Sequence, residues 1–103
     1  MIDEAYHMFG SQSASKLSLK YENIITLRTF SKSFGLPSIR LGYVIANKKI
    51  IQILNSYRLS YESNFLSDAV AEYFIKNFSI IKKYNSQVIK GREFLKNQLR
   101  KLN

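Results

Sequence analysis

The chain has 103 residues, no cysteine and a formal net charge of +9. A chain of this length has room for one compact domain, and its hydrophobic fraction of 46% is too high for a disordered tail. Without cysteine there is no disulfide framework, zinc knuckle or thiol nucleophile. The chain has no apolar run long enough for a membrane span and no secretory leader pattern, so we expect a soluble, cytoplasmic protein.

The basic charge can indicate nucleic acid or another anion as a partner. Lysine and arginine number 16 against 7 acidic residues, and most of this excess lies after residue 70. A lysine-rich, solvated helix face explains such a stretch without a ligand. The sequence has no RNP-type aromatic pattern, zinc finger or helix-turn-helix signal, so we expect no nucleic-acid partner. A basic helical binding module stays as the non-enzymatic alternative.

Two short β-branched runs predict strands in the first half of the chain. The first covers residues 23–29 and the second residues 41–46. Between them, residues 30–37 contain serine, lysine, glycine and proline, which predicts a turn. Asn47 is a good N-cap for a helix over residues 48–54, where isoleucine and leucine recur at helical spacing.

After a loop at residues 60–64, the pattern is helical from about residue 65 to the end. Apolar residues recur every seven positions, at Phe74, Ile81, Val88, Leu95 and Leu102. A break near residues 77–79 predicts two helices, the second longer than twenty residues. An isolated coiled coil is the alternative, but Asn85 and Arg92 interrupt its seam, which favours packing against a larger fold.

Two short clusters contain most of the residues able to carry chemistry. They are Asp3-Glu4-Ala5-Tyr6 and Thr29-Phe30-Ser31-Lys32, and Arg40 follows eight residues after the lysine. Taken separately, these residues have ordinary explanations, such as a helix N-cap, a core aromatic, a solvated lysine or a surface ion pair. In this order they form a pattern that four further residues complete: Gly35, Pro37, Gly42 and Tyr43.

This pattern resembles the class I and II branch of the fold-type I aminotransferases that use pyridoxal 5′-phosphate (PLP), most closely those like histidinol-phosphate aminotransferase. The resemblance runs from Ile2 to about Leu102 and covers only the middle of such an enzyme. It implies one partial α/β domain over residues 1–103, a fragment of the large domain. Its mixed sheet would have residues 41–46 antiparallel to their neighbours, and it would end in a long helix towards the missing small domain.

The cofactor's chemistry explains why such enzymes use these residue types. PLP is an electron sink whose ring nitrogen must stay protonated, so a carboxylate has to face it, and the resemblance assigns that role to Asp3 at the end of a buried strand. Tyr6 matches the phenol beside the ring's 3-oxygen. Lys32 is the predicted catalytic residue, because a primary amine forms the Schiff base with the cofactor's aldehyde and then moves the substrate's proton. We expect burial at Lys32, since burial favours the neutral amine.

Three residues resemble the family's phosphate contacts. Arg40 has a planar guanidinium that grips phosphate through two parallel hydrogen bonds, and Thr29 and Ser31 offer hydroxyl groups to the same anion. Gly35 and Pro37 would let the chain fold back, so that Lys32 and Arg40 reach opposite ends of one ligand.

A substrate contact follows from the resemblance at Arg58. In relatives a loop at this position reaches across a dimer interface to the neighbouring active site, where an arginine contacts the substrate's acidic group. His7, the single histidine, has no cysteine or second histidine with which to share a metal, so we expect neither catalysis nor a metal site there.

The predicted activity is transamination of an amino donor with a 2-oxo acid acceptor, in a family of homodimers. A PLP-dependent decarboxylase of an amino-acid phosphate shares these motifs and stays open. An acyl-condensing synthase fits less well, because that branch usually has histidine in place of Tyr6 and lacks a counterpart of Arg40. The family's phosphate-binding turn, stacking ring and carboxylate-binding arginine have no counterparts here, so we expect a truncated or incomplete form with little turnover by itself.

Overall fold

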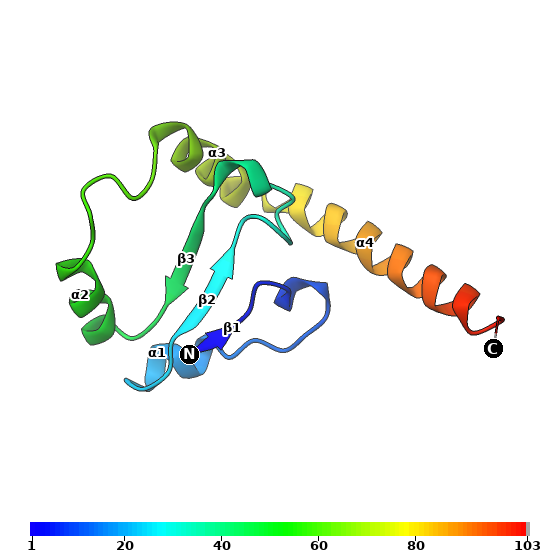
Figure 1. The fold of residues 1–103 in the computed structure, drawn as a ribbon, viewed down its shortest axis with the longest axis horizontal. Coiled ribbons are helices and arrows are strands. Elements are labelled where there is room, and N and C mark those ends of the chain that lie inside the picture. The colour runs from blue at the N-terminus through cyan, green and yellow to red at the C-terminus, as the bar shows by residue number, and fades with distance from the viewer. Residues whose placement is uncertain (103) are drawn as a thin grey trace.

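The protein is a small α/β fold with one long projecting helix (Figure 1). The structure, a computed structural model, describes residues 1–102. Its strands are β1 (Ile2–Asp3), β2 (Thr26–Thr29) and β3 (Gly42–Ile45). The α-helices are α1 (Ser15–Lys20), α2 (Lys48–Ser56), α3 (Phe65–Lys76) and α4 (Phe78–Leu99), and the short 3-10 helices are η1 (His7–Phe9) and η2 (Pro37–Ile39).

The three strands form one mixed sheet in the order β1-β2-β3. β1 runs parallel to β2, with Asp3 opposite Leu27, and β3 runs antiparallel to β2, with Gly42 opposite Thr29. The predicted α/β class and the antiparallel direction of the later strand are therefore confirmed. Both of the predicted strands are shorter than expected, since β2 and β3 pair over four positions, from Thr26 opposite Ile45 to Thr29 opposite Gly42.

The helices begin and end where local chemistry favours it. The side chain of Asn47 accepts hydrogen bonds from the backbone N–H groups of Lys49 (2.9 Å) and Ile50 (3.3 Å), which confirms the predicted N-cap of α2. This helix runs two residues further than predicted, to Ser56. The predicted break is also confirmed, since Asn77 leaves helical geometry between α3 and the 22-residue α4.

The hydrophobic core lies where the ends of β2 and β3 meet α3 and the first turns of α4. Its buried members are Phe30, Phe34, Ala71 and Ile81. The rings of Phe30 and Phe34 lie 4.5 Å apart between centroids, a close tilted pair that adds to the stability gained from burial. This core fixes the turn after β2, which contains several of the predicted site residues.

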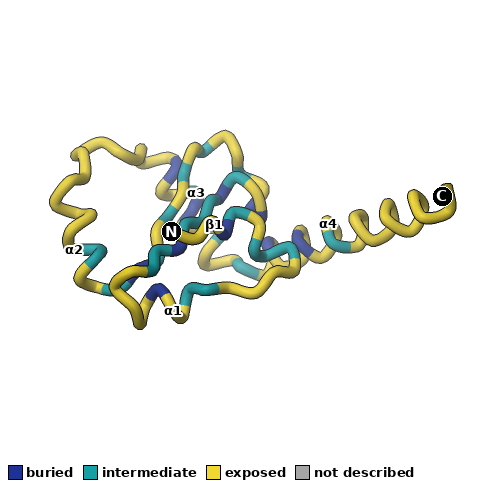
Figure 2. The backbone as a smooth tube through the Cα atoms, turned by 60° about the horizontal axis from the view of Figure 1, so that its bottom comes forward, coloured by how far each residue is buried: buried dark blue, intermediate teal, exposed yellow. Residues whose placement is uncertain are grey.

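Only the first half of the predicted apolar stripe is packed. Ile81 is 1% exposed, whereas Leu95, two heptads further along α4, is 58% exposed. Figure 2 shows the same change, from buried positions near the sheet to a fully exposed end of α4. A Cβ atom at Gly91 would meet no atom within 4 Å, so that glycine serves no close packing here. Among residues 1–102, the helices are too short or too polar to cross a membrane.

Candidate functional site

The predicted clusters meet at the edge of the sheet where β1 and β2 end. Because these strands are parallel, Asp3 and Thr29 both lie towards their common C-terminal edge, which is where ligands gather in open α/β sheets. Lys32 follows three residues after β2. Its Nζ lies 5.4 Å from the centre of the Tyr6 ring, so the amine and the phenol ring are neighbours although they come from different clusters.

Lys32 and Tyr6 are both exposed. Tyr6 is 61% exposed, which excludes its alternative interpretation as a core aromatic. The burial that we expected for Lys32 is wrong for this structure, because the segment after β2 turns its neighbours Ser33 and Phe34 into the core and leaves Lys32 outside. The amine is therefore free to meet a ligand from solvent.

Asp3 presents its carboxylate at the end of an exposed strand. Both residues of β1 are exposed, so the expectation of a buried strand is wrong; β1 lies at the edge of the sheet and pairs only with β2. Asp3 Oδ1 accepts a 2.9 Å hydrogen bond from the backbone N–H of Ala5. This local bond orients the carboxylate and bends the chain towards Tyr6.

The predicted phosphate contacts are linked through Leu41. Thr29 Oγ1 donates to the carbonyl oxygen of Leu41 (3.3 Å) and accepts from the backbone N–H of Ser31 (3.0 Å). Arg40 directly precedes Leu41. The structure therefore brings Thr29, Ser31 and the backbone of Arg40 to one end of the β2–β3 pair.

Arg40 has an unusual backbone conformation. Its φ of 51° makes it the one non-glycine residue with a positive φ among residues 1–102. Such conformations cost free energy and are concentrated at functional sites. Its Nη1 donates a 3.1 Å hydrogen bond to the carbonyl oxygen of Pro37. The expected turn is present, with Gly35 at φ 69°.

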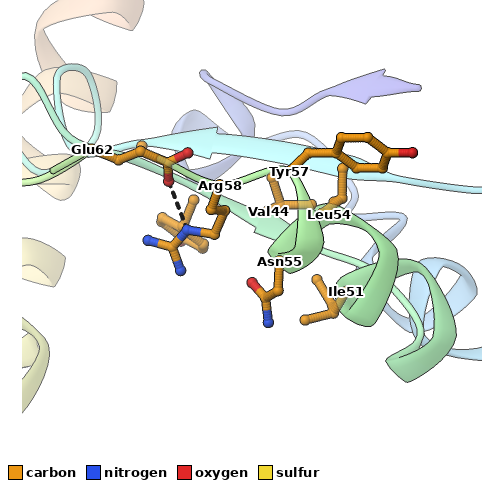
Figure 3. Close-up of a pocket in the computed structure, with 9 residues that line it drawn as sticks. Val44, Ile51, Leu54, Asn55, Tyr57, Arg58 and Glu62 are labelled. Atoms are coloured by element: carbon orange, nitrogen blue, oxygen red, sulfur yellow. Dashed lines mark hydrogen bonds and ion pairs between the residues drawn. The ribbon is translucent and has the colours of Figure 1, made fainter. Parts of the chain in front are cut away.

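Arg58 lies apart from these residues, beside a cavity of about 620 Å³ between β3 and α2. Figure 3 shows its guanidinium pointing towards Glu62, and Arg58 Nε donates to Glu62 Oε2 at 2.6 Å. The side chains of Val44, Ile51 and Leu54 provide the apolar part of the same cavity. The structure does not bring Arg58 together with the predicted cofactor residues within this chain.

Most of the predicted cofactor residues lie outside the cavities of the surface. Five of the surface cavities along residues 1–102 have volumes of about 420 to 670 Å³, and Tyr6 lines one of these five. Asp3, Lys32 and Arg40 line none of the five. All three residues are exposed, so their side chains lie on the surface of the molecule.

Sequence analysis passed over one buried acidic residue, Glu4. Its side chain is 5% exposed and forms an ion pair with Arg28, with Oε2 and Nη2 3.0 Å apart. Burial by itself would raise the pKa of Glu4, but hydrogen bonds from Ala14, Arg28 and Ser13 outweigh it and hold that pKa below its ordinary value. The sequence does contain one signal for this ion pair, the charged Arg28 inside a β-rich run. An arginine in a packed strand needs an acidic partner.

The chain is similar throughout to aminotransferases. The family model "Aminotransferase class I and II" matches residues 1–103. The histidinol-phosphate aminotransferase of Pyrococcus furiosus is 40% identical over 98 residues, which are 95% of this chain and 29% of that protein. Those of Thermotoga neapolitana and Thermotoga maritima are 36% and 35% identical, over 99% and 98% of the chain and 30% of each protein.

The chain belongs to the class I and II aminotransferase family, as the resemblance in the sequence indicated. The relatives named above are all histidinol-phosphate aminotransferases, the group that the motifs most closely resembled. Enzymes of this family depend on PLP. The chain spans about 30% of the length of the curated relatives it matches.

Proposed function

We propose that this chain forms part of a PLP-dependent aminotransferase and attaches the cofactor at Lys32. The observation that carries the proposal is the approach of Lys32 Nζ to the Tyr6 ring, 5.4 Å from its centre. These two residues come from the two clusters on which the family resemblance depends. An amine beside a phenol at the C-terminal edge of a sheet suits a cofactor that offers an aldehyde next to a ring hydroxyl.

The residues present fit such a cofactor in their chemistry. The set holds one group for each polar feature of PLP: a carboxylate, a phenol, a primary amine and a phosphate-binding group of two hydroxyls and a guanidinium. The positive φ of Arg40 supports a binding role, because strained backbone is concentrated at ligand sites. When bound, PLP supplies an electron sink for the substrate's α-carbon.

Each residue then has a defined task. With PLP bound, the Asp3 carboxylate would face the ring nitrogen and keep it protonated, and the Tyr6 phenol would donate to the 3-oxygen. Arg40 would neutralise the phosphate, with Thr29 and Ser31 as hydroxyl partners. With PLP bound, the Lys32 amine would hold the cofactor at its aldehyde carbon, with the aldehyde oxygen leaving as water. Once a substrate amine has replaced it, the freed Lys32 amine would accept the proton from the substrate's α-carbon.

The substrates and partners of the whole protein are also proposed. We infer an amino donor with a 2-oxo acid acceptor, because the family transfers amino groups and the relatives carry the name histidinol-phosphate aminotransferase. We infer a homodimer in which Arg58 contacts substrate in the partner subunit's site. None of the predicted cofactor residues lines the cavity that Arg58 borders, which supports this proposal. The cytoplasmic location stays a prediction, which fractionation of cells would test.

The experiment is to map where PLP attaches to the chain. The protein is incubated with PLP, absorbance near 420 nm is recorded, and borohydride reduction followed by peptide mapping locates the modified lysine. We expect the label at Lys32 and loss of the band in Lys32→Ala. Lys20→Ala is a matched control, because Lys20 Nζ also lies close to a tyrosine ring, 5.2 Å from the centre of Tyr21. Equal labelling of Lys20 and Lys32 would contradict the proposal.

A further inference from the structure

We propose that the buried ion pair of Glu4 and Arg28 positions Asp3 and Tyr6 relative to Lys32. The inference rests on the proposed function, because it concerns how the same site is held in place. Glu4 lies between Asp3 and Tyr6 in the sequence, so the contacts that hold Glu4 act on the short segment that contains both residues. Neither Glu4 nor Arg28 needs to touch the cofactor, and both are therefore positioning residues.

The Glu4 carboxylate joins three segments that are distant in the sequence. From β2, Arg28 donates to Glu4 Oε2 through Nε (3.1 Å) and Nη2 (3.0 Å). From the turn before α1, Ser13 Oγ donates to the same oxygen at 3.0 Å and the backbone N–H of Ala14 donates to Oε1. Two oxygens thus receive four hydrogen bonds, and the third segment, the end of β1, is fixed by them.

The backbone of Glu4 extends this connection to the Tyr6 side. Its N–H donates to the carbonyl oxygen of Leu27 at 2.9 Å, and its own carbonyl oxygen accepts from the N–H of His7 at 3.2 Å. The segment that contains Tyr6 is therefore held at both ends of a short loop. Arg28 lies between Leu27, which is opposite Asp3 in the sheet, and Thr29, a predicted phosphate contact. The ion pair therefore connects the segments that contain Asp3, Tyr6 and Thr29.

The ion pair between Glu4 and Arg28 is largely shielded from water, which strengthens its effect on geometry. Arg28 side-chain exposure is 16% and that of Glu4 is 5%, so water competes little for either group. Two N–H groups of the Arg28 guanidinium meet the same oxygen, Glu4 Oε2, and two charge-assisted bonds from one planar group restrict the angle as well as the distance. His7 on η1 and Tyr43, which lies opposite Arg28 on β3, are the further groups that interact with the charges of the pair, and neither has a carboxylate that could replace Glu4.

The experiment compares three variants of the full chain. Glu4→Gln keeps the shape of the side chain but removes its charge, Arg28→Met removes the partner, and the double variant removes both charges. Glu22→Gln is the matched control, because Glu22 forms an exposed ion pair with Lys49 at 2.9 Å. Three readouts are recorded for each: the thermal midpoint, the nuclear Overhauser contact between the Lys32 ε-methylene and the Tyr6 ring without PLP, and the rate of borohydride-trapped PLP labelling at Lys32.

We expect the Lys32–Tyr6 contact to weaken in both single variants, and PLP labelling to slow about tenfold, because a displacement of about 1 Å at a positioned group can cost up to about a hundredfold in rate. In the double variant the thermal midpoint should recover, since no buried charge is left unpaired, while contact and labelling should stay impaired. Recovery of all three would mean that the pair only stabilises the fold and would overturn the proposal. If PLP did not label Lys32 in the wild-type protein, the proposed function would be refuted. The Lys32–Tyr6 contact, which is measured without PLP, would still decide whether Glu4 positions these residues.

Discussion

Arg92 Nη1 donates a 2.9 Å hydrogen bond to the carbonyl oxygen of Phe9, which ties the middle of α4 to the end of η1. The two residues are far apart in the sequence, and the bond joins the long helix to the segment that contains Tyr6. Beyond this point α4 is exposed on all sides. The bond is therefore the last described polar anchor of the helix against the rest of the fold.

Replacing Arg92 should loosen η1 more than it loosens the helix. We expect Arg92→Ala to lower the free energy of unfolding by about 1 kcal/mol, the worth of a partly exposed hydrogen bond from a charged group. Hydrogen exchange at the amide of Gly10, which donates to the carbonyl oxygen of His7, should accelerate. Arg100→Ala, at the exposed C-cap of α4, is the control and should leave that exchange rate unchanged.

A buried pair of hydroxyl groups supports the other end of β2. Ser18 Oγ and Thr26 Oγ1 lie 2.6 Å apart, and both residues are 0% exposed. Ser18→Ala leaves the hydroxyl of Thr26 without this partner, so we expect the free energy of unfolding to fall by about 1–3 kcal/mol in urea denaturation. Ser56→Ala, at an exposed serine, is the control and should lower the free energy of unfolding far less.

The double variant Ser18→Ala/Thr26→Val tests the reason for that loss. With both hydroxyl groups removed, no polar atom is stranded, and much of the lost stability should return. If the double variant loses as much free energy of unfolding as the two single variants together, the loss comes from packing and not from the hydrogen bond between the hydroxyl groups.

Asn85 stands in the packed part of α4, where an apolar residue would suit the stripe better. It is 5% exposed, and its Oδ1 has no hydrogen-bond partner in the described chain. Leucine removes this unsatisfied group, so we expect Asn85→Leu to raise the free energy of unfolding by about 1–3 kcal/mol. The same change at the exposed Asn97 of α4 should have no comparable effect. A lower stability of Asn85→Leu would show that the amide has a role that packing cannot replace.

The sequence predicts those parts of this fold that depend on neighbouring residues. Asn47 was identified as an N-cap, and the break before α4 was located, because side chains within one helical turn decide both. The antiparallel direction of β3 came from the family resemblance and is confirmed.

The features that sequence analysis missed depend on contacts between distant segments. The burial of Glu4 requires Arg28 and Ala14, and the exposure of Lys32 requires the turn of its neighbours into the core. Residue type and spacing do not identify which side chains contact each other when they are far apart in the sequence. The clusters therefore indicated the kind of chemistry, and the structure alone showed that Lys32 and Tyr6 are neighbours.

Two ionisable groups near the end of β1 make stability depend on pH in the same direction. Burial and the positive charge of Arg28 lower the pKa of His7, while hydrogen bonds outweigh burial and lower the pKa of Glu4. In both cases the unfolded chain takes up a proton at a higher pH than the folded chain does. Stability is therefore fully present above the unfolded pKa values, and it falls as the pH decreases.

The thermal midpoint should accordingly decline in two stages on acidification. The first begins below about pH 6.5, where an unfolded histidine binds its proton, and the second below about pH 4.3, where an unfolded glutamate does. His7→Gln should remove the first stage and Glu4→Gln the second, when midpoints are measured by circular dichroism from pH 8 to about pH 3. A midpoint that rises as Glu4 is protonated would contradict the assignment, because it would mean that burial, and not the pair with Arg28, controls this carboxyl group.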